Sequence, residues 1–147
     1  LEAACQGRRP NATAGERCFV NWDEVKQMAS EGMAIGAHTH THRLLGQLSA
    51  SEQREEMVEC RRILREKAAV DADTIAYPVG QPSSFTAETK SLAAQAGYRA
   101  GFSFYGGINR PREIDRFDVR RVGVDGQSLE RFRVQTAAAA VLGSWWP

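Results

Sequence analysis

The sequence predicts an α/β fold in which parallel strands are joined by helices. Capped amphipathic helical segments alternate with short apolar, strand-like runs along most of the chain. No internal repeat or low-complexity tract interrupts this alternation. Strands that alternate with helices pair in parallel through helical crossovers, which indicates an α/β barrel or a doubly wound sheet. We expect the whole chain, residues 1–147, to form one domain, because this length is enough for a core of its own.

The first predicted αβ unit covers residues 22–37. Asn21 and Glu24 have the spacing of a capping box, which predicts the start of a helix over 22–31. Gly32 ends this helix, as a glycine after the last turn commonly does. The run of small and apolar residues at 33–37 is then expected to be a strand.

The second unit begins with a similar signal. Ser49 and Glu52 form another capping box, which predicts a helix over about 50–67. The apolar stripe of this helix consists of Met57, Cys60 and Leu64. A strand over 74–77 follows, and Pro78 ends it.

The remaining segments continue the alternation. They are a helix over 86–96, a strand over 98–104, a loop rich in glycine, proline and charge over 105–116, a strand over 119–124 and a helix over 128–141.

Composition excludes several classes of protein. The formal net charge is +1, so bulk electrostatics favour neither nucleic acid nor an anionic membrane as a partner. No apolar run is long enough to cross a bilayer, so no membrane segment is expected. Three cysteines without paired spacing argue against a disulfide scaffold and against a cysteine-type zinc site. Cys5 and Cys18 remain candidates for a disulfide within a loop.

All three histidines of the chain lie within five residues, at the carboxyl end of the strand predicted over 33–37. In α/β barrels this end of the strands carries the chemistry. His38 and His42 are four residues apart and can bind one metal ion if the chain turns there. Thr39 and Thr41 can fix the turn by hydrogen bonds, and His40 would then point elsewhere. The alternative is an exposed histidine-rich loop without a role.

The order of motifs resembles that of the NodB-type polysaccharide deacetylases, carbohydrate esterase family 4. The resemblance covers about residues 18–126. The segments that carry it are Gly32 to His42, which resembles the second motif of the family, Ile75 to Gly80, which resembles the third, and the later segments Ala96 to Gly101 and Phe117 to Val122.

The resemblance implies an incomplete (β/α)7-type barrel that binds zinc or another divalent transition metal. His38 and His42 match two metal ligands of the family. The third ligand and the catalytic base are aspartates of an upstream Thr-Phe-Asp-Asp-Gly motif, and the sequence contains no Asp-Asp pair. We therefore expect that the chain begins after the first motif and that the third ligand comes from the missing segment. Asp125 is the best-placed substitute for this ligand, but we do not expect it to replace the ligand, because coordination geometry is demanding.

Three further residues are candidates for the catalytic site. The arginine usual in the third motif is replaced by Ala76, and Arg121 on a later strand is the candidate substitute, although it could also be an ordinary surface arginine. Val79 would offer its backbone N–H to an oxyanion. Tyr77 has either a pocket role or a packing role. The Leu-x-His motif that supplies the general acid is absent, because no histidine follows His42.

The function implied is a metal-dependent hydrolase that removes acetyl groups from a polysaccharide or oligosaccharide, and the fragment alone is expected to be inactive. A non-catalytic carbohydrate-binding or scaffolding domain is one alternative, which loss of the upstream Asp-Asp pair would favour. A metallohydrolase of a small amide is another, which a deep closed pocket would favour. The resemblance also implies an extracytoplasmic or envelope location. The sequence indicates neither the sugar, nor N- or O-acetyl specificity, nor an oligomeric state.

Overall fold

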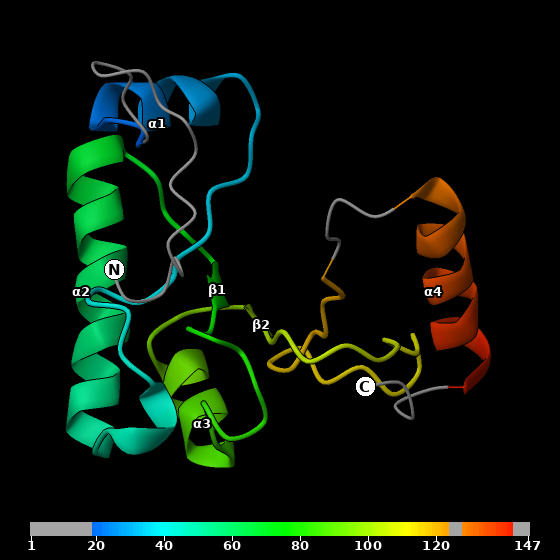
Figure 1. Cartoon of the computed structure of the whole chain (residues 1–147). Helices are drawn as coiled ribbons and strands as arrows, with labels where there is room; N and C mark the ends of the chain where they lie inside the picture. The colour runs from blue at the N-terminus through cyan, green and yellow to red at the C-terminus, as the bar shows by residue number, and fades with distance from the viewer. Residues whose placement is uncertain (1–18, 124–127, 143–147) are drawn as a thin grey trace, which may run out of the picture.

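The computed structural model describes residues 19–123 and 128–142 (Figure 1). Cys5, Cys18 and Asp125 lie outside the described residues, as does the end of the strand predicted over 119–124. The elements in order are α1 (Trp22–Ser30), the 3-10 helix η2 (Leu45–Gln47), α2 (Ala50–Ala68), β1 (Thr74–Ala76), α3 (Ala87–Gln95), β2 (Ala100–Phe102) and α4 (Leu129–Leu142). The predicted alternation of helices and strands is confirmed.

The strands pair in parallel. β1 and β2 lie in register with Ile75 opposite Gly101. Single parallel bridges extend the pairing on both sides, from Ala37 to Ile75 and from Phe102 to Val119. The chain therefore runs in the same direction through successive neighbouring segments, each preceded by a helix or a long loop, and the fold is α/β.

All four predicted strands are shorter than the sequence suggested. The strand predicted over 74–77 ends at Ala76, and of the strand predicted over 119–124 only Val119 pairs among the described residues. Within 33–37 only Ala37 pairs, through its N–H to the Thr74 carbonyl and its carbonyl to the Ala76 N–H, both at 2.8 Å. The segment predicted over 98–104 is a strand only at 100–102, because the Phe104 N–H turns away to bond the Gly80 carbonyl. The described residues form an open set of parallel segments around a two-stranded sheet. They do not by themselves show the incomplete (β/α)7-type barrel that was expected.

Local signals predicted the helices well. The Asn21 and Ser49 side chains each accept from the N3 backbone N–H. The backbone N–H of each cap residue donates in return to the N3 glutamate, so both predicted capping boxes are present. Gly32 follows α1 at φ +91°, a conformation that a glycine adopts without steric cost. The ends of these helices depend on capping residues close to them in the chain, and such residues can be recognised in the sequence.

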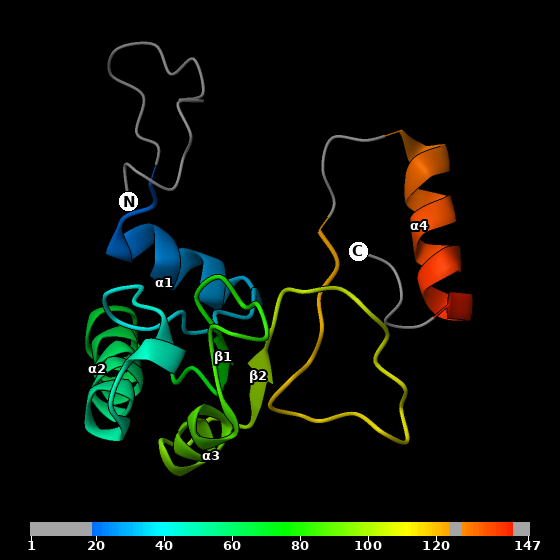
Figure 2. The same ribbon diagram turned by 60° about the horizontal axis from the view of Figure 1, so that its bottom comes forward.

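The core lies between the sheet and the helices α2 and α3. Its largest fully buried apolar side chains are those of Leu45, Met57, Ile75 and Tyr77. Figures 1 and 2 show α2 and α3 beside the strands, whereas α4 stands apart at the end of a long connection. Among the described residues, no helix is both long and apolar enough to span a bilayer.

Candidate metal site at the carboxyl end of the strands

The structure brings the rings of His38 and His42 together. His38 directly follows Ala37, the residue that bridges to β1, so its backbone is fixed at the end of the parallel segments. The ring centroids of His38 and His42 lie 4.8 Å apart, and the ring planes are inclined at 68°. This separation allows one nitrogen of each ring to approach a shared metal ion at the usual zinc–nitrogen distance of about 2.0–2.1 Å.

The hydrogen bond of His38 defines which of its nitrogens is free. Nδ1 lies 2.7 Å from the Ala76 carbonyl oxygen, and because a carbonyl can only accept, Nδ1 carries the proton and donates. Nε2 is then the nitrogen with a free electron pair. Partial burial lowers the pKa of His38, the bond to Ala76 raises it, and the neighbouring His42 and Arg121 lower it. The net direction is downward, which favours the neutral ring that a metal needs.

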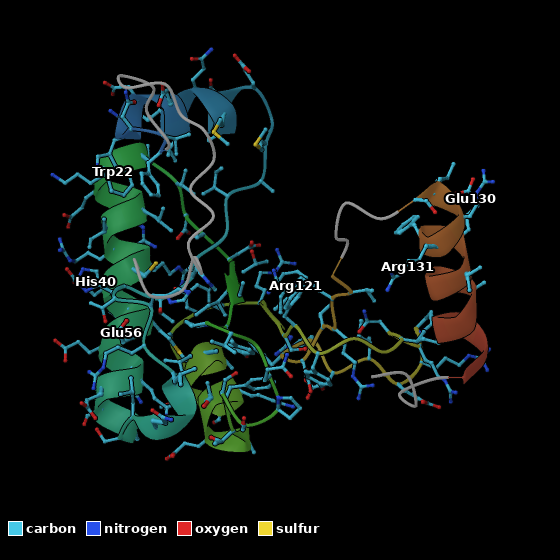
Figure 3. All side chains as sticks on the ribbon, in the orientation of Figure 1. Trp22, His40, Glu56, Arg121, Glu130 and Arg131 are labelled. Atoms are coloured by element: carbon cyan, nitrogen blue, oxygen red, sulfur yellow. The ribbon has the colours of Figure 1, made fainter. Side chains whose placement is uncertain are left out.

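A buried carboxylate holds the turn between the two rings. Glu56 of α2 accepts the backbone N–H groups of His40 at 2.9 Å and Thr41 at 2.7 Å, together with the Thr41 hydroxyl. Figure 3 shows His40 and Glu56 next to each other at α2. Burial tends to raise the pKa of Glu56, but the bonds from Thr41 and His40 outweigh it and lower that pKa, so the carboxylate is ionised.

Arg121 is an exposed residue whose charge reaches His38. It comes after Val119, which bridges to β2, and its Nε donates to the Ser103 carbonyl at 3.0 Å. Its guanidinium covers the Phe104 ring, and its charge reaches His38, whose pKa it lowers. The neighbouring Arg120 instead covers the ring of Tyr105. Arg121 is exposed, Arg120 is half-buried, and neither lies in an assigned strand. The bond to Ser103 and the contact with Phe104 therefore set the position of Arg121, and the strand register predicted over 119–124 does not.

Val79 forms an exposed turn at the end of β1. Its φ is +63°, and Gly80 donates to the Pro78 carbonyl at 2.7 Å, which closes a three-residue γ-turn around it. Its side chain is 53% exposed. Its own N–H makes no hydrogen bond with the residues that the structure describes. A free N–H at a strand end can donate to an anionic oxygen, which is the role suggested for it.

Tyr77 lies in the core. Its hydroxyl donates to the Phe117 carbonyl at 3.0 Å, its ring stacks on Phe85 at 4.5 Å, and only 1% of the residue is exposed. Burial raises the pKa of Tyr77, and the charges of Asp115 and Asp118 raise it further. Tyr77 therefore occupies the packing position that was the alternative to a pocket role.

The donor set fits part of a metal site. Among the described residues there is no group of three or more histidine, cysteine, aspartate or glutamate side chains that could hold a metal ion. His38 and His42 can provide two neutral imidazole ligands, and a catalytic zinc needs a third protein ligand. His40 lies instead beside α2, where its charge influences Glu56 and Glu59 (Figure 3).

Sequence reasoning missed Glu56. The signal was present, because Glu56 falls between Gln53, Met57 and Cys60 on the stripe of α2 that faces the protein. A carboxylate on such a stripe is seldom buried without partners. The partners are backbone N–H groups of a distant turn, which no periodicity in the sequence reveals.

The chain belongs to the polysaccharide deacetylase family, whose pattern matches residues 7–101. Members of carbohydrate esterase family 4 are generally metal-dependent hydrolases. A similar protein in Bacillus subtilis strain 168, YxkH, is assigned to the polysaccharide deacetylases. It is 29% identical over 110 residues, which make up 75% of this chain and 38% of that protein.

Solved structures of deacetylases share the fold. The Streptococcus pyogenes deacetylase PplD, in complex with acetate, superposes with a TM-score of 0.70 at 24% identity, over 83% of this chain and 53% of its own. The polysaccharide deacetylase BC0361 from Bacillus cereus superposes with a TM-score of 0.67 at 19% identity, over 79% of this chain and 36% of its own. The chain thus spans about half or less of the length of these relatives.

Proposed function

We propose that this chain carries the histidine part of the metal site in a hydrolase that removes acetyl groups from a polysaccharide, breaking the carbon–nitrogen bond of an N-acetyl group or the ester bond of an O-acetyl group. The observation that carries the proposal is the facing pair His38 and His42, with Nδ1 of His38 donating to Ala76 and Nε2 left free. Membership of the polysaccharide deacetylase family supports the substrate class. The acetate bound to the related PplD is the acid that such a reaction releases.

Each candidate residue has a defined task in this proposal. His38 and His42 hold the divalent metal, zinc or a similar ion, which when bound polarises the acetyl carbonyl and acidifies a water molecule. The Val79 N–H donates to the carbonyl oxygen as negative charge develops there. Arg121 places a positive charge beside His38 and orients an acidic group that acts as the base.

We further propose that the third ligand and the base come from a segment that is not among these 147 residues, and that the same segment adds to the incomplete (β/α)7-type barrel around the parallel segments. Two ligands alone bind zinc weakly, since catalytic sites use three protein ligands and a water. The isolated chain of 147 residues is accordingly expected to be inactive.

The second candidate function is a non-catalytic carbohydrate-binding domain with the same fold. The observation in its favour is that all three histidines of these 147 residues lie in one turn, so this part of the protein offers no later histidine as the general acid. An enzyme and a binding module differ in whether acetate appears.

The test is acetate release from an acetylated chitooligosaccharide. The protein to be tested contains these 147 residues together with the segment that supplies the third ligand and the base. The proposal expects release that stops with a chelator, returns with zinc and is lost in His38→Ala, with His40→Ala as the matched control that keeps it. Binding of the oligosaccharide without any acetate release would support the binding module instead.

A further inference from the structure

We propose that Glu56 is a positioning residue that selects His38 and His42, rather than His40, as the metal-binding pair. The conformational part of this inference stands on the contacts of the turn, and its metal part rests on the proposed function. Glu56 lies on α2, far along the chain from the histidines, and touches neither ring in the contacts described above.

The carboxylate fits the turn closely. One oxygen of Glu56 accepts both consecutive backbone N–H groups, those of His40 and Thr41, and the other oxygen accepts the Thr41 hydroxyl. Consecutive N–H groups that converge in this way form a small anion-binding concavity. Glu56 is 7% exposed and makes no ion pair with a lysine or arginine of the described residues. The turn itself is therefore what stabilises this buried charge.

The backbone on both sides of the clamped residues is strained. Thr39 has φ +62° and His42 has φ +61°, a left-handed conformation that residues with a Cβ avoid. Without the hydrogen bonds to Glu56, we expect Thr39 and His42 to leave the left-handed conformation and the chain here to become extended. The bonds to Glu56 lie between these two residues and oppose that tendency.

The extended chain and the turn held by Glu56 differ in which histidine rings can reach one metal ion. In an extended strand, alternate side chains share a face, so all three histidines would point the same way, with His38 and His42 about 13 Å apart at roughly 3.3 Å per residue. In the clamped turn the His38 and His42 rings are 4.8 Å apart. Only the turn lets those two rings share one ion.

A second residue of α2 lies near the same turn. Cys60 is one helical turn after Glu56 and is half-buried. Burial raises the pKa of its thiol, while the nearby backbone of His38 lowers it. The same face of α2 thus approaches the start of the turn, and Glu56 supplies the charged contact in its middle.

The chain offers a direct probe of this inference, because its three histidines all lie in the turn. We would record histidine side-chain NMR spectra of the metal-free 147-residue chain at fixed pH, for the unchanged protein and for Glu56→Ala and Glu56→Gln. Glu55→Ala is the matched control, since Glu55 is the adjacent residue of the same type on the same helix and is exposed.

The unchanged chain and Glu55→Ala should show a nuclear Overhauser effect between the His38 and His42 rings, and His38 protonated at Nδ1. Glu56→Ala should lose the contact between the rings and mix the two tautomers of His38. Glu56→Gln should show a weakened contact, because one oxygen remains for the backbone N–H groups but the charge is gone. If Glu56→Ala does not fold, the strength of the contact between the His38 and His42 rings in Glu56→Gln tests the inference. An unchanged ring contact in a folded Glu56 variant would overturn the inference.

Adding zinc separates this inference from the proposed function. If the unchanged chain binds zinc, Glu56→Ala should bind about 10–100-fold more weakly, as is usual when a group that orients metal ligands is lost. Equal affinity would overturn the selection of ligands by Glu56. If zinc shifts no histidine signal of the unchanged chain, the proposed metal site fails, and the metal-free spectra still decide the role of Glu56 in the turn.

Discussion

Left-handed backbone conformations mark the candidate site at the scale of single residues. Four residues other than glycine have positive φ among those described: Thr39, His42, Ala69 and Val79. Ala69 caps the end of α2, but the other three lie at the carboxyl ends of two neighbouring parallel segments. Strained residues persist where the surrounding structure holds them, and they often gather at functional sites. The strain at Val79 can be measured by itself.

Val79→Gly should stabilise the chain. Glycine adopts positive φ without the penalty of about 1–2 kcal/mol that a residue with a Cβ incurs, and little apolar burial is lost at this exposed position. Urea unfolding should show a free energy of unfolding higher by about 1 kcal/mol, and acetate release by the complete enzyme should be kept, because the backbone N–H remains. A strongly destabilised variant would show that the Val79 side chain packs in a way that the structure does not indicate.

Tyr77→Phe should affect stability and not metal binding. The variant removes the hydroxyl that donates to the Phe117 carbonyl and leaves a buried acceptor without its partner. This should cost about 1–3 kcal/mol of unfolding free energy, measured by thermal or urea unfolding. Zinc binding at His38 and His42 should be unchanged. A Tyr77→Phe variant that loses zinc affinity but keeps its stability would instead show that Tyr77 acts in the pocket.

At the scale of elements, α2 joins the hydrophobic core to the candidate site. Met57 is fully buried in the core, and Glu56, the residue before it, holds the turn that carries the histidines. Because α2 is fixed by its packing in the core, the Glu56 carboxylate is held in position for its hydrogen bonds to the turn. The contribution of Glu56 depends on its charge and should therefore depend on pH.

The stabilisation by Glu56 should be lost in acid. The pKa of Glu56 is lowered in the folded chain from its ordinary value of 4.5. A group with a lowered folded pKa contributes stability above its unfolded pKa and loses it as pH falls through the folded value. The unfolding free energies of the unchanged chain and Glu56→Gln should thus differ by a constant amount, about 1.5–3 kcal/mol, above roughly pH 5. The difference should shrink below that pH.

Urea titrations at several pH values between neutral and acid conditions measure this difference. Glu55→Gln is the control and should leave the pH dependence unchanged, since Glu55 is exposed. A Glu56→Gln difference that stays the same at every pH would mean that shape, and not charge, accounts for the effect of Glu56.

Elements that depend on neighbouring residues were predictable, and those that depend on distant partners were not. The capping boxes at Asn21 and Ser49 and the glycine after α1 were evident in the sequence. The extent of the strands was not, because Ala37 and Val119 each pair with a strand far away in sequence, and the residues beside them do not. The clamp by Glu56 escaped prediction for the same reason.

At the scale of the whole molecule, the order of helices and strands was enough to predict the α/β class and parallel pairing. The position of α4, which stands apart from the strands in both views, could not be predicted from its sequence (Figures 1 and 2). The pairing of His38 with His42 could be predicted from spacing. Arg121 lies within electrostatic reach of His38 although it is not in an assigned strand. The spacing of the histidines identifies two metal ligands and gives no indication of a third.

Zinc calorimetry on the purified 147-residue chain, run together with acetate release from an acetylated chitooligosaccharide, tests the central claim most directly. We predict zinc binding of about micromolar strength or weaker, abolished by His38→Ala and by His42→Ala but kept in His40→Ala, with no acetate released. Sub-micromolar zinc affinity with zinc-dependent acetate release would contradict the need for a further ligand and base. Equal loss of binding in His40→Ala would contradict the assignment of His38 and His42 as the metal-binding pair.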